Sequence, residues 1–136
     1  MTKNNILDKH EIALLGASLR AIEPKLLKPS KKKGSTKLWF QGDEPYFDIF
    51  FELNNDDILW FEFTLRGKSL SWDKRKLEFK TGNTNELSTN DVGFYAASKT
   101  IENDVALDWE FIYLVKSILK TRAEEQIFAK ALALFN

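Results

Sequence analysis

The sequence predicts a single α+β domain in which one N-terminal and two C-terminal helices pack on a five-stranded antiparallel meander sheet, with a sixth strand as an alternative. Apolar and polar residues alternate with period two from Lys37 to Lys80, as expected for strands with one buried face. Apolar residues recur at helical spacing on both sides of this stretch. A chain of 136 residues, 43% of them hydrophobic, can bury one core, so residues 1–136 are expected to form one domain.

The first helix is predicted from Lys9 to about Ile22. Asp8 is followed three residues later by Glu11, which is the capping-box pattern of a helix N-terminus. Pro24 would clash with the backbone of the preceding turn, so the helix is expected to end before it.

Two polar segments flank this helix. Residues 1–5 are polar and expected to be disordered, and residues 25–37 form a connector with six lysines. The connector lacks interleaved aromatic residues, and the 20 basic and 20 acidic residues of the chain cancel, so we expect a solvated loop and no nucleic-acid partner. Neither a signal peptide nor a long apolar run is present, which favours a cytoplasmic protein that does not bind a membrane.

The hairpins are predicted from the requirement that all apolar residues share one face of the sheet. Between the two central strands, a two-residue loop would place Phe51 opposite Trp60 and divide the apolar residues between both faces. A three-residue loop of Asn54 to Asp56 avoids this and places Phe51 opposite Leu59. At the other hairpins, turns at 42–45, 66–69 and 74–75 are predicted to pair Phe40 with Phe47, Phe63 with Trp72, and Leu70 with Phe79. The predicted buried set is Phe47, Ile49, Phe51, Leu59, Phe61, Phe63, Leu70 and Trp72.

The last third of the chain predicts two helices. Asp108 is a suitable N-cap for the first, whose apolar stripe consists of Phe111, Ile112, Val115, Ile118 and Leu119. Thr121 and Glu124 repeat the capping-box spacing, so a separate final helix is expected to start there. The alternative sixth strand is placed at 92–97.

The opposite face of the sheet is predicted to carry aromatic and acidic residues. The predicted registers place Asp48 opposite Glu62 and Glu62 opposite Asp73, a repulsive arrangement that needs compensation. Either basic residues of the chain (Lys37, Arg66, Arg75 and Lys76) pair with these acids, or a cationic partner or a divalent metal does. The aromatic residues on this face are Trp39, Tyr46, Phe50 and Trp60. Either the chain's own helix or its 82–107 segment covers them, or a partner does.

Catalytic groups are scarce in this sequence. His10 is the one histidine and lies away from the apolar stripe of its helix, and the chain has no cysteine, which excludes the usual serine or cysteine triads. The six glycines stand far apart and form no phosphate-binding motif. An enzyme is therefore not expected, nor a cofactor, nor a metal.

The expected function is that of a non-catalytic protein-binding module, for instance a small inhibitor or immunity-like protein. The predicted contact residues are Trp39, Tyr46, Asp48, Phe50, Trp60, Glu62 and Asp73. The aromatic face also offers a surface for a homo-oligomer. The first alternative is a small-ligand-binding domain with a pocket between sheet and helices. The second is a carboxylate-based or metal-assisted hydrolase that uses the three acids.

Overall fold

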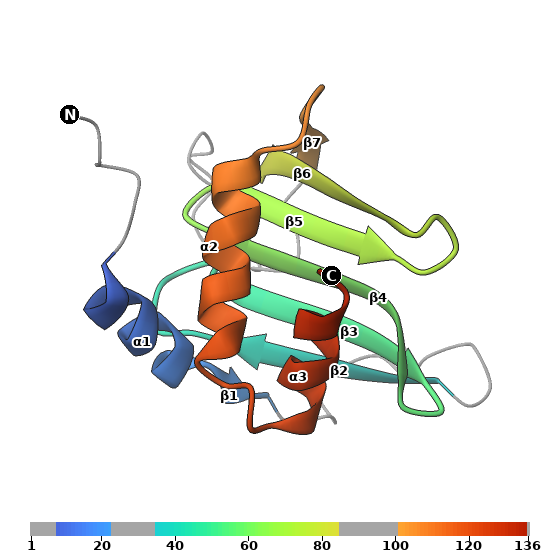
Figure 1. The fold of residues 1–136 in the computed structure, drawn as a ribbon, viewed down its shortest axis with the longest axis horizontal. Coiled ribbons are helices and arrows are strands. Elements are labelled where there is room, and N and C mark those ends of the chain that lie inside the picture. The colour runs from blue at the N-terminus through green and yellow to red at the C-terminus, as the bar shows by residue number, and fades with distance from the viewer. Residues whose placement is uncertain (1–7, 23–34, 85–100, 136) are drawn as a thin grey trace.

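The computed structural model describes residues 8–22, 35–84 and 101–135 (Figure 1). This part of the chain forms one antiparallel sheet of seven strands in chain order, with three helices on one face. The strands are β1 (Arg20–Ala21), β2 (Ser35–Gln41), β3 (Asp48–Asn54), β4 (Asp57–Leu65), β5 (Lys68–Asp73), β6 (Glu78–Thr84) and β7 (Ile101–Asn103). The helices are α1 (Lys9–Ser18), α2 (Trp109–Lys120) and α3 (Gln126–Ala133).

The predicted α+β meander with one N-terminal and two C-terminal helices is confirmed. Two short edge strands, β1 and β7, extend the five predicted strands. Three predictions lie outside the described residues: the disorder of residues 1–5, most of the lysine-rich connector (25–34) and the alternative strand at 92–97. The end of the connector, 35–37, belongs to β2.

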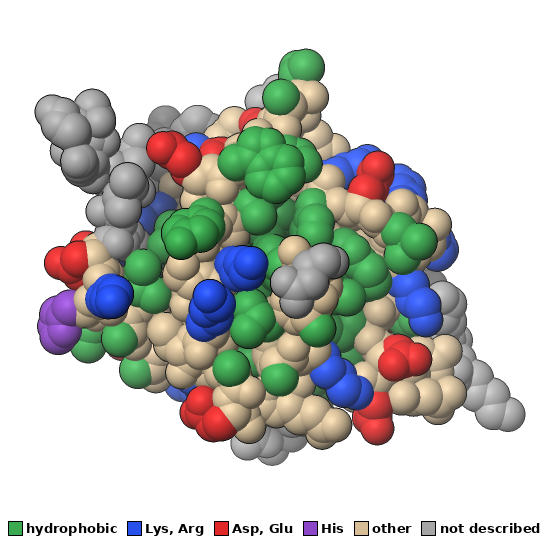
Figure 2. Space-filling view, viewed as in Figure 1, with side chains coloured by type: hydrophobic (Ala, Val, Ile, Leu, Met, Phe, Trp, Pro, Cys, Tyr) green, Lys and Arg blue, Asp and Glu red, His purple; other side chains and the backbone are tan. Residues whose placement is uncertain are grey.

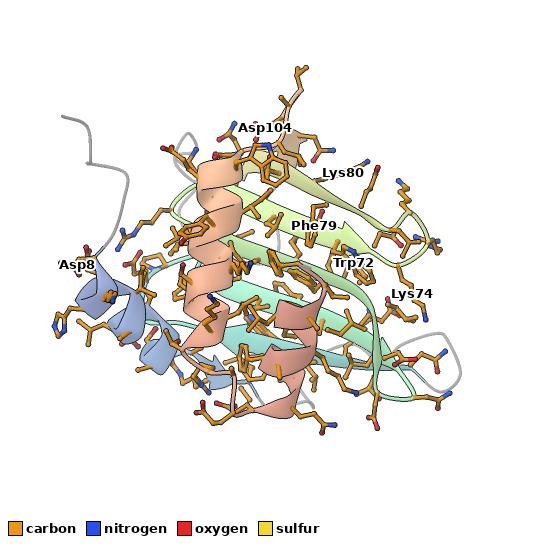
Figure 3. The ribbon with its side chains drawn as sticks, in the orientation of Figure 1. Asp8, Trp72, Lys74, Phe79, Lys80 and Asp104 are labelled. Atoms are coloured by element: carbon orange, nitrogen blue, oxygen red, sulfur yellow. The ribbon has the colours of Figure 1, made fainter. Side chains whose placement is uncertain are left out.

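The core lies between the sheet and the helices. Every predicted core residue of the sheet is buried except Leu59, which is half-buried. Phe128 of α3 packs against Phe40 and Phe51, with ring centroids 4.9 and 6.4 Å apart. On the β5–β6 side of the core, Trp72 and Phe79 are cross-strand neighbours (Figure 3).

The predicted loop between β3 and β4 is wrong, although the face assignment that motivated it is correct. The turn has two central residues, Asn55 and Asp56, both left-handed with φ of 53° and 72°. This conformation matches the twist of a tight hairpin. A register shift then makes Leu59 an extra residue, so that Leu53 lies opposite Ile58 whereas Phe51 lies opposite Phe61. The bulge at Leu59 thus keeps the apolar residues of β3 and β4 on the same face of the sheet, which a two-residue loop alone would not do.

The other three predicted hairpins also have the wrong register, each by two residues. Phe40 pairs with Ile49, Phe63 with Leu70 and Trp72 with Phe79. The reason lies in the loops, because Tyr46, Arg66 and Leu77 adopt left-handed φ angles of 61°, 51° and 52°, which sequence preferences do not indicate for these residues. A shift of two residues leaves each side chain on its predicted face.

Helix α1 is shorter than predicted. Asp8 caps it as expected and accepts a hydrogen bond of 2.8 Å from the backbone N–H of Glu11 (Figure 3). The helix ends at Ser18 because the chain becomes extended at Leu19 and enters β1. The guanidinium of Arg122 binds this end, donating to the carbonyl oxygens of Gly16 and Leu19 at 2.8 Å each.

Helix α2 begins as predicted, with Asp108 accepting a hydrogen bond of 3.1 Å from the N–H of Phe111. All five residues of its predicted apolar stripe are buried. The predicted capping box for α3 is wrong, because Thr121 ends α2 and its hydroxyl donates to the carbonyl of Ile118 at 2.6 Å. Helix α3 has Glu125 at its N-cap position, and the carboxylate of Glu125 pairs with Arg122.

Because of the bulge, truncating the neighbouring residues Ile58 and Leu59 should lower the free energy of unfolding by different amounts. Ile58 is buried against the core, so Ile58→Ala should lower the free energy of unfolding by about 2 to 5 kcal/mol. Leu59→Ala removes a half-buried side chain at the bulge and should cost less than about half as much. Urea unfolding of both variants tests this order. A larger loss for Leu59→Ala would support the three-residue loop instead.

Candidate functional site

The face of the sheet turned away from the helices, here called the outer face, is built from three rows of cross-strand neighbours. The observed registers define these rows. The first row is Gln41, Asp48, Thr64, Ser69 and Gly82; the second is Trp39, Phe50, Glu62, Ser71 and Lys80; the third is Lys37, Glu52, Trp60, Asp73 and Glu78.

Exposure increases across these rows. In the first row, Asp48, Thr64 and Ser69 are buried, with 0%, 1% and 3% of their surface exposed. The second row is half-buried throughout, and the third is exposed at both ends, at Lys37 and Glu78. The accessible part of the outer face is therefore formed by the second and third rows.

Trp39 is held in place by two neighbours on β3. Its ring stacks on that of Phe50, with centroids 5.4 Å apart and planes at 19°. Its indole N–H donates a hydrogen bond of 2.9 Å to the buried carboxylate of Asp48. The one polar group of the indole is thus satisfied from within the domain, and the partly exposed ring is fixed in orientation.

Tyr46 and the β2–β3 loop lie at the buried end of the outer face. The carbonyl of Tyr46 accepts a hydrogen bond of 3.0 Å from the hydroxyl of Thr64. In the same loop, Glu44 accepts two hydrogen bonds from Arg66, at 2.9 and 2.6 Å. The hydrogen bonds from Arg66 hold the pKa of Glu44 below its ordinary value, since a donated guanidinium proton favours the charged carboxylate. This ion pair connects the loop to the β4–β5 turn.

The predicted row of opposed acids is not formed. Asp48 lies opposite Thr64, Glu62 lies between Phe50 and Ser71, and Asp73 lies between Trp60 and Glu78. The three carboxylates occupy three different rows because the observed registers differ from the predicted ones by two residues. Within the described ranges, no group of three or more potential metal-binding side chains is present.

One of the four basic residues, Arg75, pairs with an acid of the predicted row, as one of the two hypotheses expected. Arg75 donates to both carboxylate oxygens of Asp73, at 3.2 and 3.0 Å, and to one of them again through its backbone N–H at 2.9 Å. These hydrogen bonds lower the pKa of Asp73. Arg66 pairs with Glu44 and not with an acid of the outer face. His10 is exposed on α1, on the other side of the sheet.

Sequence reasoning missed two aromatic residues on α2. Trp109 and Tyr113 are 69% and 72% exposed, the only aromatic side chains among the large exposed hydrophobic residues of the described chain. The sequence could have indicated their exposure, because the two residues are four positions apart and lie outside the apolar stripe of the helix.

Neither a protein-family model, nor a curated protein, nor a solved structure matches this chain. No helix in the described part of the chain is long and apolar enough to cross a membrane.

The bond between Trp39 and Asp48 predicts a measurable coupling. Trp39→Phe removes the indole N–H and keeps an aromatic ring, whereas Asp48→Ala removes the acceptor. In a double-mutant cycle of urea unfolding, the two substitutions should show a coupling energy of about 1.5 to 3 kcal/mol, the usual net contribution of a hydrogen bond to a charged group. Additive effects would mean that the indole is not held by this carboxylate.

The ion pair between Arg66 and Glu44 predicts how the free energy of unfolding changes with pH. The folded-state pKa of Glu44 is lowered, so the pair stabilises the protein above the ordinary pKa of 4.5 and loses this effect as the pH falls through the lower folded value. The side chains of Arg66 and Glu44 are 46% and 32% exposed. Solvent screening should therefore keep the contribution below about 1 kcal/mol. The free energies of unfolding of wild type and Glu44→Gln in urea should differ at pH 7, and the difference should shrink as the pH falls below 4.5. A constant difference would contradict the assignment.

Proposed function

We propose that this protein is a non-catalytic protein-binding module whose contact surface is the second and third rows of the outer face. The observation that carries the proposal is the anchoring of Trp39, whose partly exposed ring is fixed by Phe50 and by Asp48. An aromatic side chain that is already ordered loses little conformational entropy on binding. Tryptophan is also among the residue types that contribute most to binding hot spots.

Trp60 supplies the second anchor. It is half-buried in the third row, directly between Glu52 and Asp73 on the neighbouring strands. Arg75 already pairs with Asp73, so the ring together with the neighbouring carboxylate of Glu52 suits a partner that presents a basic side chain beside an apolar one. Phe50 and Glu62 have further interactions within the chain, so the two tryptophans carry the proposal.

The predicted contact residues take different roles in this proposal. Trp39, Trp60 and Asp73 lie on the accessible rows, together with Phe50 and Glu62. Asp48 is fully buried and Tyr46 belongs to the flanking loop, so these two support the surface from behind or beside it. An inhibitor or immunity-like role, a cytoplasmic location and a homo-oligomer through this face stay predictions.

No observation favours the two alternatives over this function. The described side chains between sheet and helices form a packed apolar cluster rich in phenylalanine. A hydrolase would need carboxylates that act together on one bond, whereas the registers place Asp48, Glu62 and Asp73 in separate rows.

The test compares tryptophans on opposite faces of the domain. Proteins captured from the source cell by the wild-type chain are identified, and the affinity of the purified partner is measured by titration calorimetry. Trp39→Ala and Trp60→Ala should each weaken binding by about 2 kcal/mol or more, which is roughly a 30-fold change in Kd. Trp109→Ala, on the helix side, is the matched control and should leave Kd unchanged.

Stability measurements complete this test. The urea midpoint of Trp60→Ala should stay close to that of the wild type if the ring serves a partner. An unfolded Trp60→Ala variant would show that the ring is part of the chain's own packing. Equal loss of binding in Trp109→Ala would place the contact on the helix side.

A further inference from the structure

One stripe of α2 residues, here called the α2 stripe, has an aromatic half and a cationic half. Its residues are Trp109, Tyr113, Lys116 and Lys120, spaced four, three and four residues apart. This is the spacing of positions that face a partner helix in a coiled coil, so all four side chains lie along one line on the helix. Figure 2, viewed from the helix side, shows hydrophobic and basic side chains next to one another over α2.

The four side chains of this stripe are not engaged elsewhere in the described chain. Trp109 and Tyr113 are mostly exposed and form none of the aromatic contacts found among the described residues. Lys116 and Lys120 form no ion pair with any described carboxylate. Lys120 is exposed and Lys116 is half-buried. Among the described residues, this stripe therefore offers two exposed aromatic rings without a ring contact and two ammonium groups without an ion pair.

We propose that the α2 stripe is a self-association surface, on which two copies of this chain pair through antiparallel α2 helices. A twofold axis between residues 114 and 115 places Trp109 opposite Lys120 of the second copy and Tyr113 opposite Lys116 of the second copy. Each ring then receives a cation over its face, and the symmetry doubles every such contact. The two rings precede the two lysines along α2, so the rings of one copy meet the lysines of the other in the antiparallel orientation alone.

The charges at the end of the stripe support the same orientation. Glu110 is exposed and follows Trp109, so it lies about 100° around the helix on the flank of the stripe, at the end where Lys120 of the second copy arrives. In a parallel pair, Lys120 would meet Lys120 and Lys116 would meet Lys116, and the like charges would repel. An acidic peptide or an anionic membrane would use the two lysines but would meet Glu110 beside the tryptophan.

The size of the surface sets the strength of the association. Helix α2 has 12 residues and is therefore about 18 Å long. A single pair of such helices belongs to the class of interfaces below about 1,200 Å², which are weak and transient. We therefore expect a reversible dimer that depends on protein concentration and does not contribute to the folding of the monomer.

Sedimentation equilibrium of the full chain tests the proposal, over about 10 µM to about 1 mM, a range that suits a weak interface. The wild type should show a reversible monomer–dimer equilibrium. Trp109→Lys should lower the association constant at least about tenfold, because it replaces two ring–cation contacts with two repulsive pairs. The double variant Trp109→Lys with Lys120→Trp exchanges ring and cation and should recover most of this loss. Leu77→Ser, at an exposed leucine in the β5–β6 loop, should have no effect.

A spin-label measurement tests the antiparallel orientation. The chain has no cysteine, so Ala123→Cys, at an exposed position just after α2, introduces a single labelling site. In the antiparallel dimer the two labels lie at opposite ends, roughly 25 Å apart along the helix axis, whereas a parallel pair would bring them within about 15 Å.

Three results would overturn the proposal. A wild-type chain that stays monomeric at every concentration would show that this stripe does not self-associate. A dimer that Trp109→Lys does not weaken would form through another surface, and Trp60→Ala would then test the outer face. A short distance between the labels would exclude the antiparallel pair. None of these results affects the proposed contact with another protein, which uses the opposite face.

Discussion

The extra residue at Leu59 decides which side chains of the sheet meet the helices. Side chains alternate with period two, so a hairpin with a two-residue turn and no bulge would place Phe51 opposite Trp60. The bulge moves Phe51 opposite Phe61, and the apolar residues of all central strands then share one face. The aromatic and acidic residues of the outer face owe their position to the same single residue. Core and candidate binding surface are thus two consequences of one local irregularity.

The faces of the sheet could be predicted from the sequence, whereas the registers could not. An error of two residues moves a side chain along its face without inverting it, so Phe47, Ile49 and Phe63 were correctly assigned to the core despite wrong pairings. The registers depend on turn conformations, and here Arg66 and Leu77 adopt left-handed angles that their residue types disfavour. The predicted acidic row depended on these registers, so the structure does not contain it. The aromatic residues of the candidate site depended only on the face assignment, so they stay on the outer face.

The helix layer shows how long-range contacts override local sequence signals. Thr121 and Glu124 have the spacing of a capping box, yet the hydroxyl of Thr121 closes α2. A Cβ atom on Gly16 would come within 1.9 Å of the Thr121 hydroxyl oxygen, so α1 can approach this turn because residue 16 is a glycine. The guanidinium of Arg122 then binds the end of α1 and lies 5.1 Å from the ring centre of Phe128. The contacts of Gly16 and Leu19 with residues 121 and 122 join positions about 100 apart, which no local pattern encodes.

The two proposed surfaces lie on opposite sides of the domain, and this has a consequence for how they would act together. The outer face is on the side of the sheet away from the helices, whereas the α2 stripe is on the outside of the helix layer (Figures 1 and 2). In a dimer formed through α2, the helices lie at the centre and the two outer faces point away from each other. One partner molecule cannot then reach both tryptophan surfaces, unless it carries two binding segments on a linker that spans the dimer. Self-association would therefore raise the number of partner molecules bound per particle without changing the intrinsic affinity of each site.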